Sequence, residues 1–303
     1  MVELSVIIVT YNSAHEIEAC LRSLQAEIAN WSHEVFVVDN ASKDRTLEVI
    51  RDSFPWVKLV ANAHNAGFPG ANNQAIAVAT GELLLLLNPD TVVPERSIAR
   101  MVAEMRRDPR LGICGPRLVD GDGNAAEDIR LPSLARLARD VITGELWPRP
   151  PLPPARVEAL SGAALLVRRS VVEKVGLLDE QMFWREDVDY CRRALEAGFA
   201  VRLVADATIV HLVGRTAVSN LALALEKPIS SEIAYFAKHG GRAFALSATC
   251  LLALQTCQRL LKWSFIRMVR DSPVARERVR AFRTTLRRFP EFYRVAVARY
   301  PGR

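Results

Sequence analysis

The sequence predicts an α/β fold, a mostly parallel sheet with flanking helices, followed by a basic helical C-terminal extension. Two β-branched runs, at 5–10 and 35–38, each end in polar residues and precede apolar residues at helical spacing. A third run, five leucines at 83–87, does not alternate with polar residues, which is typical of a strand buried on both faces. The repeated order of strand, polar tip and helix is that of βαβ units with right-handed crossovers.

The first strand, at 5–10, leads into a predicted helix. Ile17, Leu21 and Leu24 recur there at helical spacing. Ser13 stands where a side chain can cap the start of that helix, so we expect it to be the cap.

The second strand, at 35–38, ends at Asp39, and a second helix is expected from about Arg45. An Asp at this strand end can accept hydrogen bonds from the ribose or base of a nucleotide. Alternatively, Asp39 and Asp44 only form a turn and a helix cap. No GxGxxG follows the first strand, which disfavours a Rossmann dehydrogenase, and Tyr11 in that place suggests a ring packed on a base.

The leucine run at 83–87 is the centre of the predicted sheet, although a short apolar run is also compatible with buried helix. Pro89 removes a backbone donor and favours an extended conformation at Asn88, so the strand ends there. Asp90 is thereby placed at the carboxyl end of the sheet, where ligands bind in open α/β folds. The alternative is that Asp90 only caps a helix that begins near Pro94.

Asn72 and Asn73 are expected to open a helix through about 79, after a glycine-flanked turn at 67–70. Three later elements are expected: an amphipathic helix at 98–105, a short strand at 111–116 and a strand at 207–210. Residues 119–154 are loop-like and end in a proline cluster. We interpret them as an insertion over the site and not as a domain boundary.

A cluster of acidic residues, Glu186, Asp187 and Asp189, falls at the start of a predicted helix. Carboxylates in a first turn are stabilised by the helix dipole, so a solvated acidic turn is one interpretation. Phe183 and Trp184 come shortly before the cluster. A carboxylate held against such rings but open to one hydroxyl can act as a general base, which is the other interpretation.

Composition limits the class of protein. A chain of 303 residues that is 50% hydrophobic can bury a large core and is not disordered. The five cysteines are scattered and odd in number, which argues against a disulfide framework or a zinc site and fits a reducing cytosol. The residues after Met1 do not have the pattern of a signal peptide, so none is expected.

The motifs, taken in chain order, resemble those of the inverting family 2 glycosyltransferases of GT-A fold. The similarity is strongest to their bacterial rhamnosyltransferase-like branch and covers roughly residues 4–215. Five motifs carry the resemblance: Val9-Thr10-Tyr11-Asn12, Val38-Asp39-Asn40-Ala41-Ser42, Asn65-Ala66-Gly67-Phe68 with Asn72, Leu87-Asn88-Pro89-Asp90, and Glu186-Asp187-Val188-Asp189. Five ordered motifs are far more specific than any one of them.

The resemblance implies a role for each matching residue. Asp187 matches the catalytic base of the family, and Asp90 matches the last Asp of its DxD motif, which binds the divalent cation. The residues implied in nucleotide-sugar binding are Thr10, Tyr11, Asn12, Asp39, Asn40, Asp44, Asn65, Gly67, Phe68, Asn72 and Arg215. Those expected on the acceptor side are Ser161, Gly162, Trp184 and Glu186.

The metal site departs from the family pattern, because Asn88 stands where the first Asp of DxD is expected. One carboxylate fewer weakens a site for Mg2+ or Mn2+, which is held by few carboxylates plus phosphates. By the resemblance, His211 completes the site with Asp90. Taken alone, a single His after a strand is more often structural.

The resemblance implies a single displacement with inversion, in which Asp187 deprotonates the acceptor hydroxyl and the nucleoside diphosphate leaves. Two alternatives stay open. A nucleotidyltransferase would share the sheet but normally has a glycine-rich basic loop after the first strand, which 10–13 lacks. A catalytically silent sugar-nucleotide-binding protein is the other.

We expect a glycosyltransferase domain at 1–220, with a donor part at about 1–118 and an acceptor part at about 119–220. A helical extension follows at 221–303. Residues 259–303 carry thirteen Lys and Arg against three acidic residues, on a chain whose formal net charge is +6. The uncharged stretch at 243–258 is too short and polar for a span of about 20 apolar residues, and so predicts an interfacial helix.

The expected partners follow from these features. One is a dTDP- or UDP-linked sugar donor, for which dTDP-L-rhamnose is the first candidate. The other is a glycan or lipid-linked acceptor used in cell-surface polysaccharide assembly. The basic extension predicts peripheral contact with the inner, cytoplasmic face of the cell membrane. The alternative is that the extension packs on the catalytic domain or on a second copy in a homodimer. Nucleic acid is not an expected partner, since no binding motif accompanies the charge.

Overall fold

The structure is a computed structural model that describes residues 2–126, 129–143, 157–182, 184–212 and 221–301, with the side chains of 221–224 excepted. The chain forms two compact units. The α/β unit comprises Met1–Leu131, Pro151–Glu180 and Glu186–Arg215. The helical unit comprises Pro132–Pro150, Gln181–Arg185 and Thr216–Arg303.

The α/β unit is built on one mixed sheet, whose described strands follow the order β3-β2-β1-β4-β7-β6-β8-β5. Its strands are β1 (Leu4–Thr10), β2 (His33–Asp39), β3 (Lys58–Ala61), β4 (Leu83–Leu87), β5 (Thr91–Val92), β6 (Leu111–Val119), β7 (Ala164–Arg168) and β8 (Ala200–His211). The pairs β1–β2, β2–β3, β1–β4 and β6–β8 are parallel. Strand β7 is antiparallel to both β4 and β6, and strand β5 is antiparallel to β8. The predicted α/β fold is confirmed.

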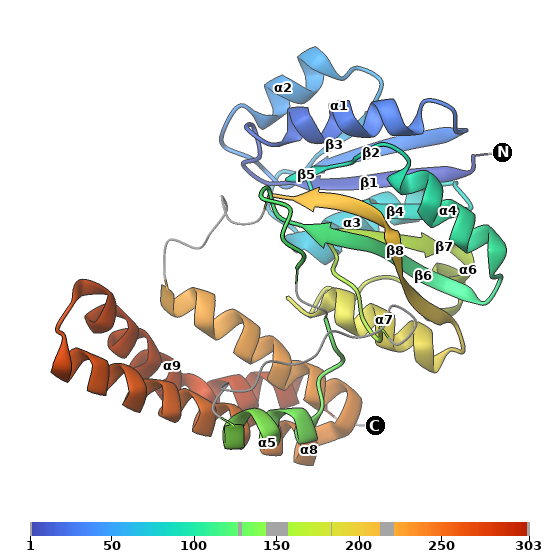
Figure 1. Cartoon of the computed structure of the whole chain (residues 1–303). Helices are drawn as coiled ribbons and strands as arrows, with labels where there is room; N and C mark the ends of the chain where they lie inside the picture. Colours follow the sequence, from blue (N-terminus) through green and yellow to red (C-terminus); the bar gives the residue numbers. More distant parts are fainter. Residues whose placement is uncertain (1, 127–128, 144–156, 183, 213–220, 302–303) are drawn as a thin grey trace. The chain divides into compact units, whose positions relative to one another are not determined.

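Helices cover both faces of this sheet (Figure 1). They are α1 (Ile17–Ile28), α2 (Thr46–Ser53), α3 (Gly67–Val78), α4 (Ser97–Arg107), α6 (Arg169–Val175) and α7 (Glu186–Glu196). Alternate residues of β1 and β4 point to opposite faces, so Val6 and Leu85 join a core with Leu21 of α1 and Met101 of α4. All five leucines of β4 are buried, as expected for a central strand.

Strand register gathers the polar ends of the first strands at one edge. Thr10, the last residue of β1, lies opposite Asp39, the last residue of β2. Leu87, the last residue of β4, lies opposite Ile8 of β1. The chain leaves the sheet at Asn88, as predicted, and the candidate ligand residues that follow each strand therefore share this edge.

Three predictions about local structure are wrong. The side chain of Ser13 does not cap α1; instead its carbonyl accepts from the N–H of Ile17 at 3.0 Å, and its hydroxyl accepts from Tyr11. Helix α3 begins at Gly67, before Asn72, because Pro69 fits the first turn of a helix. Residues 119–154 are not all loop, since α5 (Leu134–Thr143) forms within them and belongs to the helical unit. The proline cluster at 148–154 lies outside the described residues.

The helical unit contains α5, α8 (Leu221–Val269) and α9 (Pro273–Arg299). Gly241 interrupts α8 with a φ of 76°, a left-handed value that favours glycine, so α8 consists of two helices. Buried aromatic residues, among them Tyr235, Phe282 and Phe289, fill the contact between α8 and α9. Residues Leu225–Val269 are long and apolar enough to cross a membrane by length and composition, but the stretch is weak evidence for a span, since Gly241 breaks it.

Candidate functional site

The end of β1 is fastened to the loop that follows β2. The hydroxyl of Thr10 donates to Asp39 Oδ1 at 3.0 Å. The hydroxyl of Ser42 donates to the same oxygen, and its backbone N–H donates to Asp39 Oδ2 at 3.0 Å. Thr10 and Asp39 are fully buried. The Asp39 carboxylate therefore holds this loop against the strand end from inside.

Tyr11 and Asn12 lie on the surface beside this loop. Asn12 has a φ of 54°, a left-handed conformation that Asn tolerates better than most residues. Its backbone N–H donates to Ser42 Oγ at 2.8 Å, and its Oδ1 accepts from the N–H of Lys43 at 2.7 Å. The Tyr11 side chain is 44% exposed, so its ring can stack on a planar ligand.

Asp44 accepts hydrogen bonds from the first residue of α2, Thr46. Its carboxylate accepts from the backbone N–H groups of Ala14 and Thr46, both at 3.1 Å, and from the Thr46 hydroxyl. Burial opposes ionisation, but these hydrogen bonds outweigh it and lower the pKa of Asp44 below its ordinary value. Asp44 is therefore a fixed negative charge beside Tyr11 and Asn12 at neutral pH.

Asn40 organises the loop between β3 and α3. Its Oδ1 accepts from Asn62 Nδ2 at 3.0 Å and from the N–H of Ala66 at 3.2 Å, and its Nδ2 donates to the carbonyl of Gly67 at 3.1 Å. Gly67 has a φ of 75°, which an L side chain would strain, and its N–H donates to Asn65 Oδ1 at 2.8 Å. Asn40 is thus satisfied within the protein and shapes the loop.

Helix α3 carries two neighbouring asparagines with different partners. Asn72 is buried and donates to the carbonyl of Phe68 at 2.9 Å, within its own helix. Asn73 exchanges two hydrogen bonds with the backbone of Leu178, at 2.9 and 3.0 Å. The sequence indicated only that Asn73 stands near the start of a helix. Asn73 joins α3 to the segment that precedes the acidic cluster, a long-range contact with no local sequence signal.

Asp90 and His211 meet at the end of β4 and β8. The Nε2 atom of His211 lies 3.2 Å from Asp90 Oδ1, and Asn88 Nδ2 lies 3.5 Å from the same nitrogen. The N–H of Leu212 donates to the Asp90 carbonyl at 2.9 Å, which fixes the two strand ends together. Both side chains are mostly buried, with about one fifth of each exposed.

This pair fits part of a divalent-cation site. Two neighbouring ligands of an octahedral ion that is bound at about 2.1 Å lie roughly 3 Å apart, close to the separation of Asp90 Oδ1 and His211 Nε2. Among the described residues, no group of three His, Cys, Asp or Glu side chains is arranged to hold a metal. The remaining ligands of an ion here would be phosphate oxygens and water, as is usual for Mg2+.

Cys20 lies next to this pair and was not recognised from the sequence. Its Sγ approaches the carbonyl of Asn88 at 3.5 Å and the hydroxyl of Thr91 at 3.6 Å. Burial, with a smaller effect of nearby Asp90, raises the pKa of the Cys20 thiol to about 12. Because a thiolate is the form that binds metals, Cys20 stays a packing residue of α1.

Two backbone N–H groups position the carboxylate of Asp187, which lies in the first turn of α7. The N–H of Gly162 donates to Asp187 Oδ2 at 2.8 Å, and the N–H of Val188 donates to Oδ1 at 2.7 Å. A Cβ at Gly162 would lie 3.5 Å from Asp187 Oδ2 and 3.5 Å from Phe68 Cε1. Asp187, Gly162 and Phe68 are therefore neighbours, although three separate segments supply them.

Asp189 has a different environment from Asp187. It is fully buried, and Arg193 Nε donates to its Oδ2 at 2.8 Å. The same guanidinium donates to the carbonyls of Val175 and Leu177, both at 2.9 Å. Asp189 therefore anchors α7 to the segment before it.

The other residues expected on the acceptor side are Ser161, Glu186 and Trp184. Ser161 Oγ accepts from the N–H of Ala163 at 3.2 Å, in the turn that precedes β7. Glu186 is the first residue of α7. Trp184 is 48% exposed, has a φ of 70° and belongs to the helical unit. Arg215 lies outside the described residues.

Two family models match the chain. The model described as glycosyl transferase family 2 matches residues 5–150, and the model described as glycosyl transferase family group 2 matches residues 83–265. The second match spans more than half of the 303 residues.

Relatives and solved structures agree with these matches. An N-acetylglucosaminyl-diphospho-decaprenol L-rhamnosyltransferase of Mycobacterium tuberculosis is 33% identical over 248 residues, which is 72% of this chain and 80% of that protein. The mannosyltransferase PcManGT from Pyrobaculum calidifontis, solved with GDP-Man and Mn2+, superposes with a TM-score of 0.60 at 18% identity, covering 99% of this chain and 87% of that one. TarS 1-349 of S. aureus, solved with UDP-GlcNAc, gives a TM-score of 0.54 at 16% identity, covering 95% and 92%.

These likenesses confirm the family that the sequence motifs indicated. The relative at 33% identity and the family models identify the enzyme class, and the structural neighbours show the fold of the α/β unit. A nucleotidyltransferase is thereby excluded. The chain belongs to glycosyltransferase family 2, and it is a glycosyltransferase with the GT-A fold.

Proposed function

We propose that this glycosyltransferase transfers L-rhamnose from dTDP-L-rhamnose to a hydroxyl of a lipid-linked acceptor in cell-surface polysaccharide assembly, with inversion at the anomeric carbon. The relative at 33% identity, an N-acetylglucosaminyl-diphospho-decaprenol L-rhamnosyltransferase, supports both the sugar and the kind of acceptor. The Asp90–His211 pair and the Asp187 carboxylate support a single-displacement reaction.

The proximity of Asp187 to Phe68 is the observation that carries the proposal. Phe68 follows the loop that Asn40 and Gly67 shape, and we assign this loop to the floor of the donor pocket. Gly162 lies between Phe68 and the carboxylate, since a Cβ there would lie 3.5 Å from Phe68 Cε1 and 3.5 Å from Asp187 Oδ2. In this proposal, the acceptor hydroxyl lies between the base and the sugar of the donor.

The chemistry divides between two groups of residues. Asp187 accepts the proton of the acceptor hydroxyl, whose oxygen forms the new bond to the anomeric carbon while the bond to the nucleoside diphosphate breaks. The two backbone donors, Gly162 N and Val188 N, fix the orientation of the Asp187 carboxylate. Asp90 and His211 would hold a divalent cation, Mg2+ or Mn2+, which when bound neutralises the charge on the leaving diphosphate. No covalent intermediate is required.

The donor nucleotide lies, in this proposal, against the loops after β1 and β2. Tyr11 offers an exposed ring to the base, and the polar groups of Asn12 and Asp44 lie beside it. Asp39 and Thr10 support the loop from below. Residues 1–118 would thus serve the donor, and residues 119–220 the acceptor.

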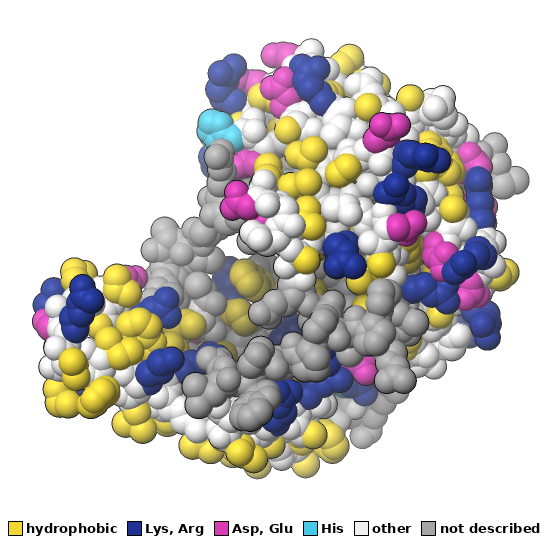
Figure 2. Space-filling view, viewed as in Figure 1, with side chains coloured by type: hydrophobic (Ala, Val, Ile, Leu, Met, Phe, Trp, Pro, Cys, Tyr) yellow, Lys and Arg dark blue, Asp and Glu magenta, His cyan; other side chains and the backbone are white. Residues whose placement is uncertain are grey.

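The helical unit provides the proposed contact with the membrane. Five exposed apolar side chains gather at the end of the α8–α9 hairpin, and we call them the tip patch: Leu261, Phe265, Met268, Val269 and Val274. Figure 2 shows apolar side chains over this end of the hairpin, with Lys and Arg side chains beside them. Apolar side chains bordered by cations favour the boundary of an anionic bilayer, so we assign the enzyme to the inner face of the cell membrane.

A panel of nucleotide sugars tests the donor assignment. Ligand binding raises the apparent melting temperature by mass action, so dTDP-L-rhamnose should stabilise the protein more than UDP-GlcNAc, GDP-mannose or dTDP-glucose at equal concentration. Transfer to a prenyl-diphosphate-linked acceptor should then require the same donor. Stabilisation and transfer with another donor alone would overturn the rhamnose assignment and leave the family assignment in place.

A further inference from the structure

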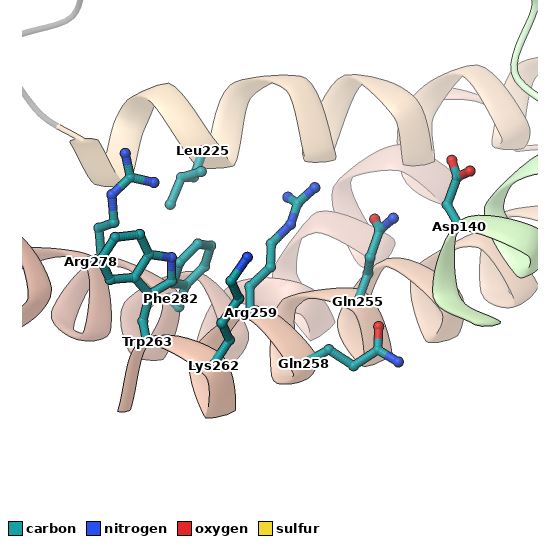
Figure 3. A pocket seen from close by; sticks show the side chains of 9 residues that line it. All are labelled: Asp140, Leu225, Gln255, Gln258, Arg259, Lys262, Trp263, Arg278 and Phe282. Atoms are coloured by element: carbon teal, nitrogen blue, oxygen red, sulfur yellow. The ribbon is translucent and has the colours of Figure 1, made fainter. Parts of the chain in front are cut away.

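The helical unit contains a cavity of about 510 Å3 between α5, both parts of α8, and α9 (Figure 3). Its volume is within the range of roughly 300–1,000 Å3 that is usual for small-ligand sites. The hydrogen bond from Gln258 Nε2 to the carbonyl of Val141, at 2.9 Å, fastens α5 to α8 and closes one side. All lining residues belong to the same compact unit.

The lining is strongly cationic. Arg259 and Lys262 extend from the second part of α8, Arg278 extends from α9, and Asp140 of α5 is the acidic residue of the lining (Figure 3). Within the described parts of the chain, no carboxylate lies within 4 Å of the Lys262 ammonium or the Arg278 guanidinium. Two cations that share a cavity and form no ion pair among the described residues create a positive potential that attracts an anion.

The cavity also has an aromatic wall. The Arg278 guanidinium lies 4.6 Å from the centre of the Trp263 ring, a cation–π contact that fixes its position. Phe282 is buried beside it. Arginine in a fixed position recognises phosphate oxygens well, because its donors form a planar fork.

The same turn of α8 carries residues of the cavity and residues of the tip patch. Lys262 and Trp263 line the cavity, whereas Leu261 is 70% exposed and Phe265 is 62% exposed. Successive residues of a helix point about 100° apart, so one turn can serve both surfaces. A bilayer that accepted the tip patch would bring its headgroups to the level of Lys262.

We propose that this cavity binds the phosphate or diphosphate head of a membrane lipid, whose chain runs along the tip patch into the bilayer. Lys262, Arg259 and Arg278 bind the phosphate oxygens, and Trp263 and Phe282 contact the first carbons of the chain. Two lipids share this chemistry, an anionic phospholipid and a prenyl-diphosphate-linked acceptor. Only the second rests on the proposed function.

Binding of the full-length protein to vesicles tests the proposal. The vesicles are phosphatidylcholine alone, phosphatidylcholine with phosphatidylglycerol, and phosphatidylcholine with a prenyl diphosphate at equal total charge. The cavity variant is Lys262→Gln with Arg278→Gln. The matched control is Arg267→Gln with Arg270→Gln, which removes the same charge from exposed positions at the end of α8. Lys262→Gln alone is the second variant, because Lys262 is exposed and its loss leaves the cation–π contact intact.

We expect the cavity variant to bind anionic vesicles about tenfold or more weakly than the wild type, and the control variant less than about threefold. Equal losses in both variants would show general attraction to anionic surfaces and overturn the proposal. Equal binding to the two anionic vesicles supports a phospholipid head, and tighter binding to the prenyl diphosphate supports the acceptor. Saturation of the cavity by orthophosphate, at constant ionic strength, without any loss of vesicle binding would reassign the cavity to a free anion and overturn the lipid assignment.

Transfer to a water-soluble acceptor separates this inference from the proposed function. The cavity variant should keep that activity within about twofold, because the cavity is distinct from Asp90, His211 and Asp187. A protein that transfers rhamnose but binds lipid independently of the cavity contradicts the inference alone. A protein that uses another donor contradicts the rhamnose assignment alone.

Discussion

The imidazole of His211 lies 3.2 Å from the carboxylate of Asp90, and strand pairing is the cause. The short strand β5 begins at Thr91, directly after Asp90, and pairs with β8 so that Thr91 lies opposite His211. The hydrogen bond from Leu212 N to Asp90 O continues this ladder beyond the strand. The candidate cation ligands are thus held by backbone geometry and not by side-chain packing alone.

The first prediction concerns this pair. If Asp90 and His211 hold the cation, EDTA should abolish transfer and Mg2+ or Mn2+ should restore it. Asp90→Ala should lose both donor affinity and the response to metal, because the diphosphate would lose its bridge to the protein. Donor binding is measured by calorimetry with and without metal, and Asp122→Asn, an exposed residue, is the control. Full activity in EDTA would assign the charge on the diphosphate to protein cations instead.

The second prediction concerns the base. Asp187→Asn should lower turnover by roughly 100-fold or more, while donor binding stays nearly unchanged, because the amide still accepts from Gly162 N but cannot take the acceptor proton. Glu186→Gln, in the same turn, should be milder. Single-turnover measurements would separate the chemical step from release. Turnover of Asp187→Asn near that of the wild type would refute the assignment.

A third prediction concerns acid stability. Glu34 is buried and accepts hydrogen bonds from Lys58, Thr80 and Ser5. Burial alone would raise the pKa, but these donors outweigh burial and lower the pKa of Glu34 from its ordinary 4.5 to about 2. Its contribution to stability is therefore complete above pH 4.5 and is lost as the pH falls through about 2.

Glu34→Gln should therefore unfold more easily by about 1–3 kcal/mol at neutral pH. The difference from the wild type should shrink as the pH falls from about 4.5 toward 2. Urea unfolding at a series of pH values measures it. Glu18→Gln, whose carboxylate forms an exposed pair with Arg22, is the control and should change stability little. A constant difference across this range would contradict the assignment.

The fourth prediction concerns the tip patch. Leu261→Gln with Phe265→Gln should reduce flotation with anionic vesicles by at least about tenfold, because two large apolar side chains would no longer enter the bilayer boundary. Val78→Gln with Leu177→Gln removes exposed apolar side chains from the α/β unit and is the control. Binding should also weaken as salt rises. A full-length protein that never floats would contradict the membrane role.

Much of the fold could be predicted from the sequence, because strand signals and helix periodicity are local. The leucine run of β4 and the break at Pro89 gave the position of Asp90, and the βαβ rhythm gave the parallel order of β1, β2 and β4. The antiparallel insertion of β7 between β4 and β6 could not be predicted, since pairing between distant strands leaves no trace in local periodicity. Helix α5 was not predicted, because the glycines and prolines on either side of it indicate loop and made the whole stretch look loop-like.

The residues of the candidate site were predicted from the sequence, since five ordered motifs indicated the family and marked the strand ends. The sequence determined that polar residues follow β1, β2 and β4 at one edge of a sheet. Only the tertiary structure decided what each residue does there. It buried Asp39 under the loop, paired Asp189 with Arg193, and placed His211 beside Asp90 and Gly162 beside Asp187. The physical reason is that hydrogen-bond partners and burial depend on segments far apart in the chain, which meet only when the sheet and helices pack.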